Sequence, residues 1–183
     1  AFDSRTLTVW SPDGQWIVYT MAGVQADVVR SRADGSGQPE VLLPRKRSDG
    51  DQLATAISPD GKLLVLTEDS AETGSDLWTL SLVDRSRKLV LGTRFNEQAA
   101  VFSPDGRTLA FVSDETGRSE VYVQPFPGPG ARRQVSVGGG WAPVWSRTAG
   151  ELFYQSGTSL MRRSRTASRR RSDATTGRLR PSR

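Results

Sequence analysis

The sequence predicts an all-β protein built from the blades of a β-propeller, and three observations support this fold class. The tetrapeptide Ser-Pro-Asp-Gly begins at Ser11, Ser58 and Ser103, at spacings of 47 and 45 residues. A short apolar run rich in β-branched or aromatic residues follows each copy. A degraded fourth copy spans 145–154. A period in the forties is typical of propeller blades and of helical arrays, and the turn chemistry of the repeat favours the propeller.

Each tetrapeptide is expected to form the turn of a β-hairpin. Proline presets φ at the second position of a turn, aspartate suits the next position, and glycine accepts the positive φ that closes the hairpin. An aspartate in such a turn commonly accepts hydrogen bonds from nearby backbone N–H groups. We therefore assign structural roles to the nine turn residues Pro12, Asp13, Gly14, Pro59, Asp60, Gly61, Pro104, Asp105 and Gly106.

Four strands are predicted in each full repeat. An inner strand precedes the turn, a buried second strand follows it, a third strand lies about ten residues later, and an outer strand ends the unit. The third outer strand is expected over 133–137. The resulting blades cover about 5–44, 51–92, 97–137 and 140–161. The chain thus contains three four-stranded blades and an incomplete fourth, which together make a partial propeller over residues 1–161.

The length of the chain limits the number of blades. Closed propellers have typically four to eight blades, and six blades of this period need on the order of 270 residues, whereas this chain has 183. We expect a piece of a larger protein or a truncated gene product. Unpaired blade faces then expose apolar surface, which favours self-association.

Most aromatic residues recur at corresponding strand positions and are expected to fill the layers between blades. They are Trp10, Trp16, Trp78, Phe102, Phe111, Tyr122, Trp145, Phe153 and Tyr154. Four other residues lie just before inner strands, near the expected mouth of the central channel. Arg94, Asn96, Glu97 and Trp141 are therefore candidate contacts for a protein or a small ligand at the channel face, with an ordinary surface loop as the alternative.

Composition argues against several chemistries. The chain has no His and no Cys, which removes thiol nucleophiles, the usual zinc ligands and a Ser-His-Asp triad. The carboxylates lack the spacing of a calcium loop, and the glycine-rich segments match no nucleotide-binding pattern. We predict no catalytic residue, no metal, no cofactor and no enzymatic activity for this chain. No apolar run approaches the 18 residues of a transmembrane segment.

The positive charge is concentrated at the carboxyl end. Residues 162–183 contain nine Arg and one Asp, so this segment carries a charge of +8. Residues 1–161 carry −3, and the whole chain carries +5. This Arg/Ser-rich tail has almost no apolar residues and is expected to be disordered.

Three interpretations of the tail stay open. Clustered Arg residues attract nucleic acid and anionic lipid, which makes weak nonspecific anion contact one of them. Ser164, Ser168 and Ser172 lie beside basic residues and could accept phosphate. The abrupt change of composition after Met161 is also typical of noncoding sequence read in a shifted frame.

The hairpins resemble the WD40-like PD40 repeat, found in TolB, in the gating propellers of prolyl oligopeptidases and in propellers of bacterial eukaryote-like Ser/Thr kinases. The resemblance covers roughly residues 5–161 and rests on the segments 9–14, 76–78, 95–97, 102–130 and 151–154. Kinase propellers are the nearest in this comparison of motifs. The fourth hairpin departs from the pattern, with Thr148-Ala149-Gly150 in place of Asp-Gly.

The resemblance implies noncovalent recognition by a sensor or interaction module of a larger bacterial kinase. The alternatives are a gating propeller of a serine peptidase and a TolB-like scaffold, and the resemblance to TolB also implies a periplasmic location. Sequence of the parent gene discriminates among them, because a kinase domain precedes its propeller whereas a hydrolase domain follows it.

Overall fold

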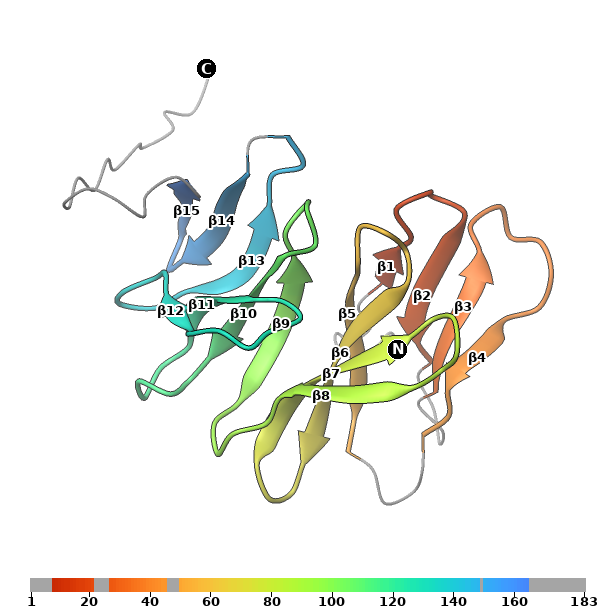
Figure 1. The fold of residues 1–183 in the computed structure, drawn as a ribbon, viewed down its shortest axis with the longest axis horizontal. Helices are drawn as coiled ribbons and strands as arrows, with labels where there is room; N and C mark the ends of the chain where they lie inside the picture. The colour runs from red at the N-terminus through yellow and green to blue at the C-terminus, as the bar shows by residue number, and fades with distance from the viewer. Residues whose placement is uncertain (1–7, 22–26, 46–49, 149, 165–183) are drawn as a thin grey trace.

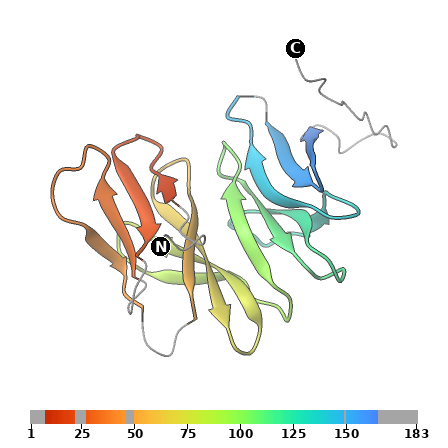
Figure 2. The same ribbon diagram turned by 180° about the vertical axis from the view of Figure 1, so that it is seen from behind.

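The computed structural model describes residues 8–21, 27–45, 50–148 and 150–164. Over these residues the chain forms fifteen β-strands in four antiparallel sheets. Figures 1 and 2 show the sheets following one another in chain order, with the first and the fourth at opposite ends. The all-β fold class and the unclosed set of propeller-like blades are confirmed. Within the described part of the chain, no helix is long and apolar enough to cross a membrane.

The first two sheets are four-stranded meanders. Blade 1 has the order β1-β2-β3-β4, with the bounds Thr8–Trp10, Trp16–Thr20, Val28–Arg32 and Glu40–Leu43. Blade 2 has the order β5-β6-β7-β8, with the bounds Gln52–Ile57, Leu63–Ser70, Gly74–Ser81 and Arg87–Leu91. In both blades, strands that are adjacent in sequence pair as antiparallel neighbours. The first strands of successive blades contact one another, so the first strand of each blade is its inner strand.

Blades 3 and 4 follow the same plan. Blade 3 consists of β9 to β12, with the bounds Glu97–Phe102, Thr108–Ser113, Glu120–Pro125 and Arg133–Gln134. Blade 4 consists of β13 to β15, with the bounds Trp141–Trp145, Glu151–Ser156 and Ser159–Ser164. The fourth blade therefore has three strands within the described residues.

Two strand ends differ from the sequence prediction. Strand β12 stops at Gln134, short of the predicted end at Val137, because the Ser136 hydroxyl accepts a hydrogen bond from the Val121 N–H at 2.7 Å. Strand β15 continues to Ser164, past Met161, because main-chain pairing with β14 does not require apolar side chains. The rest of the Arg/Ser-rich tail, residues 165–183, lies outside the described residues.

The Ser-Pro-Asp-Gly turn is closed by its own side chains. In blade 2 the Ser58 hydroxyl donates to Asp60 Oδ1 at 2.6 Å and accepts from the Leu63 N–H at 2.9 Å. Asp60 Oδ1 also accepts from the Lys62 N–H at 3.1 Å, and Gly61 has a φ of 72°. The turns that begin at Ser11 and Ser103 repeat these contacts. The turn roles of the predicted residues therefore follow from a local hydrogen-bond network.

Loss of one turn hydroxyl gives a testable effect on stability. Ser103 is fully buried, and its hydroxyl accepts from the Thr108 N–H at 3.0 Å. Ser103→Ala leaves that buried donor unpaired, so we expect the free energy of unfolding to fall by about 1 to 2 kcal/mol. Ser11→Ala removes the same contacts at a more exposed turn, where water replaces them, and we expect a smaller loss. Urea unfolding of both variants measures the difference, and equal losses would contradict the account.

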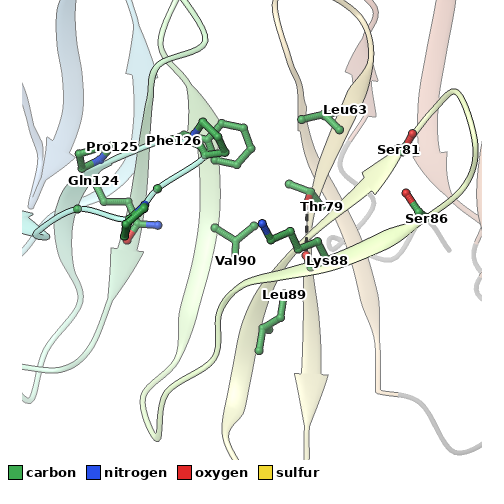
Figure 3. A pocket seen from close by; sticks show the side chains of 14 residues that line it. Leu63, Thr79, Ser81, Ser86, Lys88, Leu89, Val90, Gln124, Pro125 and Phe126 are labelled. Atoms are coloured by element: carbon green, nitrogen blue, oxygen red, sulfur yellow. Dashed lines mark hydrogen bonds between the residues drawn. The ribbon is translucent and has the colours of Figure 1, made fainter.

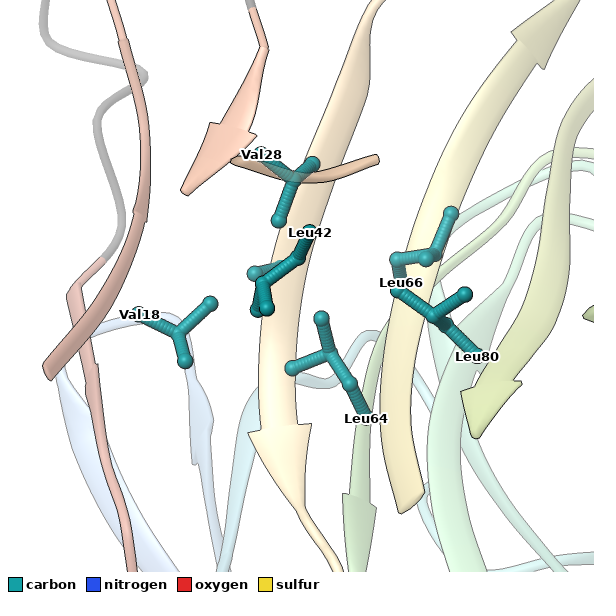
Figure 4. Close-up of a cluster of buried hydrophobic side chains, with 7 residues drawn as sticks. Val18, Val28, Leu42, Leu64, Leu66 and Leu80 are labelled. Atoms are coloured by element: carbon teal, nitrogen blue, oxygen red, sulfur yellow. The ribbon is translucent and has the colours of Figure 1, made fainter. Parts of the chain in front are cut away.

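Three apolar layers hold the blades together. The first layer joins blade 1 to blade 2 and contains Val18, Val28, Leu42, Ala54, Leu64, Leu66 and Leu80 (Figure 4). The second joins blade 2 to blade 3 through Val65, Leu77, Ala100, Phe102, Leu109, Phe111 and Tyr122. The third joins blade 3 to blade 4 through Ala110, Val112, Val121, Val123, Val135, Leu152 and Tyr154. Each blade is therefore stabilised mainly by its neighbours.

The predicted aromatic core is only partly observed. Phe102, Phe111, Tyr122 and Tyr154 are buried in the layers between blades. Trp10 is an exception, because its side chain is 57% exposed. This residue lies on the inner strand of blade 1, on the side away from blade 2.

A buried acid fastens the third strand of blade 3 to the linker that follows. Glu120 is 2% exposed and accepts hydrogen bonds from the Ser136 hydroxyl and from the N–H groups of Gly138 and Gly139, the last two at 2.9 and 2.8 Å. Asp27 does the same in blade 1, where it accepts from the Arg45 N–H at 2.9 Å. These acids fix the start of the chain segment that leads to the next blade.

Candidate functional site

The segment Arg94–Glu97 joins blade 2 to blade 3. It lies between the end of β8 and the start of β9, and Glu97 is the first residue of β9. Arg94 is exposed, and its guanidinium lies over the Phe95 ring, 5.0 Å from the ring centroid. Arg94 is thus the member of this predicted group that offers an accessible charge to a partner.

Asn96 joins two hairpins through hydrogen bonds. Its backbone N–H and its side-chain amide donate to the two carboxylate oxygens of Asp114, at 2.9 and 2.6 Å. Its Oδ1 accepts from the Ser75 N–H at 3.2 Å. The hydrogen bonds from Asn96 lower the pKa of Asp114, so this carboxylate stays ionised at neutral pH. The contacts of the Asn96 amide are thereby directed to the protein itself.

Glu97 is placed differently from the sequence prediction. Its side chain is fully buried, accepts hydrogen bonds from the hydroxyl and the N–H of Thr93, and lies 3.9 Å from an Arg132 nitrogen. Burial raises the pKa of Glu97 above its ordinary value. The carboxylate therefore stabilises the junction between blades 2 and 3, and it is not accessible to a ligand in this arrangement.

Trp141 lies one blade further along, at the first residue of β13, and is 51% exposed. It pairs with Gln155 of β14, and the register shifts between Trp141 and Val144. Trp141 thus begins the inner strand of blade 4 as Glu97 begins that of blade 3, and the two residues belong to successive linkers. A shared role of the four residues at the channel face stays a prediction.

A concave site that the sequence did not predict lies beside blade 2. A cavity of about 600 Å³ lies between blade 2 and the loop that follows β11, at the end of the blades that carries the Ser-Pro-Asp-Gly turns. We call it the inter-blade groove (Figure 3). Its walls are Leu63, Thr79, Ser81, Ser86, Lys88, Leu89 and Val90 on one side and residues 124–130 on the other.

The wall formed by residues 124–130 is well anchored. The Phe126 ring packs edge-on against Phe102, with 5.1 Å between the ring centroids. A side chain at Gly130 would meet the Pro125 ring at 2.5 Å, so the loop folds closely on itself there. The Pro/Gly-rich run over 125–130, beside an outer strand, is the sequence signal that could have indicated a wall of this kind.

The opposite wall combines apolar and polar groups. The Thr79 hydroxyl donates to the Lys88 carbonyl at 3.3 Å, and the Ser86 hydroxyl donates to Asp84 at 2.7 Å. Figure 3 shows the Lys88 ammonium extending into the space between the walls, next to Val90. The groove therefore offers one cation and several apolar side chains to an occupant.

The turn beside the groove makes stability depend on pH. Hydrogen bonds from the hydroxyls of Ser81 and then Ser86 lower the pKa of Asp84 from 3.8 to about 2. A carboxylate with a lowered pKa stabilises the fold above its unfolded pKa, and this contribution is lost as the pH falls through the folded pKa. We expect the free energy of unfolding to decline between about pH 4 and pH 2, and the pKa values of Asp13, Asp34, Asp60 and Asp114 are shifted the same way.

Urea unfolding at a series of pH values measures this decline. Asp84→Asn removes one titrating group and should make the decline shallower. Glu97→Gln is the matched contrast: the raised pKa of Glu97 means that its ionisation opposes folding, so this variant should change the pH dependence above pH 4 in the opposite direction. A stability that is constant from pH 4 to pH 2 would contradict the assignment.

Four antiparallel sheets stacked through apolar layers define a β-propeller module, and its concave site is a groove between two blades. Within the described residues, no group of three or more His, Cys, Asp or Glu side chains could hold a metal ion. Residues 3–177 match the PD40 family, described as the TolB beta propeller domain, and the chain belongs to this family.

Known relatives agree with this assignment. The chain is 31% identical over 111 residues to the Tol-Pal system protein TolB of Anaeromyxobacter dehalogenans, an alignment that covers 60% of this chain and 24% of the relative. The chain thus aligns with about a quarter of the length of the curated relatives it matches.

Solved structures show the same fold. A putative TolB from Agrobacterium tumefaciens aligns with a TM-score of 0.71 at 18% identity, over 84% of this chain and 55% of that one. TolB from Acinetobacter baumannii aligns with a TM-score of 0.67 at 23% identity, over 86% of this chain and 40% of that one. The TolB-type propeller predicted from the hairpins is therefore confirmed, whereas a particular relation to kinase propellers stays a prediction.

Proposed function

We propose that this chain is a non-catalytic recognition module that binds a protein partner in the inter-blade groove. The observation that carries the proposal is the cavity of about 600 Å³ between blade 2 and the loop 124–130. This volume falls in the range of sites that enclose a ligand or the anchor side chains of a partner. The anchored loop supports binding to a preformed surface, which lowers the entropic cost of association.

The groove favours an extended segment of a protein. Strand β8 is the last strand of its sheet among the described residues, so its outer edge offers backbone donors and acceptors to an added strand. Val90 and Phe126 suit an apolar side chain of that segment, and Lys88 suits a carboxylate. The partner we propose is therefore a protein with an extended segment that carries both kinds of side chain.

The curated relatives are named as Tol-Pal system proteins, and we infer that the partner of this chain is a component of such a system. Calorimetric titration with purified Pal from Anaeromyxobacter dehalogenans tests this inference. We expect saturable binding, and Lys88→Glu should weaken it at least about tenfold by reversing the charge in the groove. Absence of binding at high concentration would contradict the choice of partner.

A second basic residue provides the matched control. Arg94 is exposed at the linker between blades 2 and 3, near the predicted mouth of the channel. Arg94→Glu makes the same change of charge away from the groove and should leave the affinity for Pal within about twofold, as expected for a residue outside the contact. Loss of binding in Arg94→Glu together with retention in Lys88→Glu would assign recognition to the channel face.

The sequence also supports a finer proposal for the parent protein. The run 120–130 followed by three glycines resembles the propellers of bacterial eukaryote-like Ser/Thr kinases. We propose that the module then acts as the sensor of such a kinase, which a kinase domain encoded before the propeller would support. A hydrolase domain after the propeller, or a small α/β domain before it, would support the peptidase or the TolB-like alternative instead.

A further inference from the structure

The junctions between blades 1 and 2 and between blades 2 and 3 share one backbone frame. The residue five positions after the turn serine donates its N–H to the hydroxyl of that serine, from Trp16 in blade 1 and from Leu63 in blade 2, both at 2.9 Å. The first residue after the third strand donates its N–H to the carbonyl four positions after the turn serine, from Leu82 in blade 2 and from Phe126 in blade 3. Trp16 and Leu63 are therefore equivalent, and so are Leu82 and Phe126.

The junction between blades 1 and 2 is filled by side chains of the chain itself. The guanidinium of Arg30 lies over the indole of Trp16, 4.3 Å from the ring centroid. Arg30 is opposite Glu40 in the ladder, and its Nε donates to Glu40 Oε2 at 2.7 Å. The cavity that remains beside Trp16, against Ile57 and Leu82 of blade 2, measures about 300 Å³. An aromatic ring beneath a cation thus occupies this junction.

The inter-blade groove is the equivalent place one junction further along, with smaller side chains. Leu63 replaces Trp16 there. Thr79 replaces Arg30, because each pairs with the residue two positions after Leu63 or Trp16 in its own blade. Thr79 is opposite Lys88 in the ladder. The cavity measures about 600 Å³ here, against about 300 Å³ beside Trp16.

The side chains around the groove suit an aromatic ring. Phe126, in the position of Leu82, packs edge-on against Phe102, and aromatic rings prefer edge-on or offset contacts with further rings. The Lys88 ammonium extends into the space between the walls, next to Val90 (Figure 3), and a cation close to the face of a ring attracts it. A ring in the groove therefore has a cation available for its face and a second ring for its edge.

We propose that the partner bound in the inter-blade groove inserts an aromatic side chain under Lys88, in the place that Trp16 fills at the preceding junction. The inference rests on the function proposed above and adds the chemistry of the anchor. The ammonium has three donors, so it can also pair with a carboxylate of the same segment. Leu63 and Thr79 determine this specificity, because their larger counterparts in blade 1 fill the equivalent space.

Methyl NMR of the full chain, with N-acetyltryptophan as the probe, tests the anchor without a partner protein. We expect saturable shifts of the methyl groups of Leu63, Leu89 and Val90, which line the groove. The dissociation constant should be at least about fivefold lower than for N-acetylleucine, which has the same carboxylate and no ring. The methyl groups of Val18 and Leu42, in the layer between blades 1 and 2, should not shift.

Three variants test the geometry. Leu63→Trp places the blade 1 side chain in the groove and should abolish the shifts. Lys88→Met removes the cation at an exposed position, so folding should be unchanged and the probe should bind at least about threefold more weakly. Val137→Trp is the matched control, because Val137 is 84% exposed and outside the groove, and it should bind the probe like the unchanged chain. Circular dichroism checks the folding of each variant.

The outcomes separate the anchor from the choice of partner. Pal binding that Lys88→Glu weakens and Leu63→Trp leaves unchanged would keep the groove as the recognition site and overturn the aromatic anchor. Equal affinities for N-acetyltryptophan and N-acetylleucine, full probe binding in Lys88→Met, or groove methyl groups that do not respond would also overturn it. Probe-dependent shifts that are lost in Leu63→Trp, in a chain that does not bind Pal, would support the anchor and contradict the choice of Pal.

Discussion

Phe111→Ala lowers the free energy of unfolding by about 3 to 5 kcal/mol, the range expected when a buried phenylalanine is truncated. Phe111 is fully buried in the layer between blades 2 and 3, and its ring stacks on Tyr122 at 5.9 Å between centroids. Truncation removes this contact and leaves a cavity in a layer that joins two β-sheets. Urea or thermal unfolding followed by circular dichroism measures the loss.

The control for this variant is an exposed apolar residue. Val137 is 84% exposed after β12, and we expect Val137→Ala to change the free energy of unfolding by less than about 0.5 kcal/mol. If Phe111→Ala unfolds with the same midpoint as Val137→Ala, the layer between blades 2 and 3 is not packed around Phe111 as the structure shows.

Glu120→Ala is expected to lower the free energy of unfolding by about 2 to 4 kcal/mol, because it leaves buried hydrogen-bond donors without a partner. The carboxylate accepts from the Ser136 hydroxyl and from the N–H groups of Gly138 and Gly139. These groups begin the linker to blade 4, so the variant should also loosen the junction between blades 3 and 4. Calorimetric unfolding measures both the loss of stability and any separate transition of blade 4.

Two variants calibrate this result. Glu120→Gln keeps one carbonyl acceptor for the glycine N–H groups and should lose less stability than Glu120→Ala. Glu72→Ala removes an exposed carboxylate from the turn between β6 and β7 and should change stability little. A Glu120→Ala chain as stable as Glu72→Ala would show that the buried carboxylate does not hold the linker.

Local turn chemistry accounts for the part of the fold that could be predicted. Proline, aspartate and glycine in fixed order set the backbone of each hairpin, and the Ser58 hydroxyl completes the network without help from distant residues. Apolar runs after the turns then indicate strands. The turn residues and the apolar runs are short segments of sequence, and they can therefore be recognised without knowledge of the tertiary structure.

The positions of the candidate site residues depend on contacts between blades. A repeat pattern in the sequence does not show these contacts. Glu97 looks like an exposed acid in a linker, yet Thr93 and Arg132 enclose it at the junction. The inter-blade groove forms only where residues 124–130 come to lie opposite β8. Trp10 resembles the core aromatics of the other inner strands, but its side chain is exposed because none of the described blades packs against it. In each case, packing between distant segments decides the role.

Amide hydrogen exchange of the full chain, measured by mass spectrometry, tests most directly whether the four blades pack against one another. We expect the slowest exchange in β6, β7, β10 and β11, which lie between apolar layers on both sides, and clear protection of β14 against blade 3. Strands β1 and β15 should exchange faster. Rapid exchange throughout blade 4, or equal protection of every strand, would contradict a propeller whose blades are held by their neighbours.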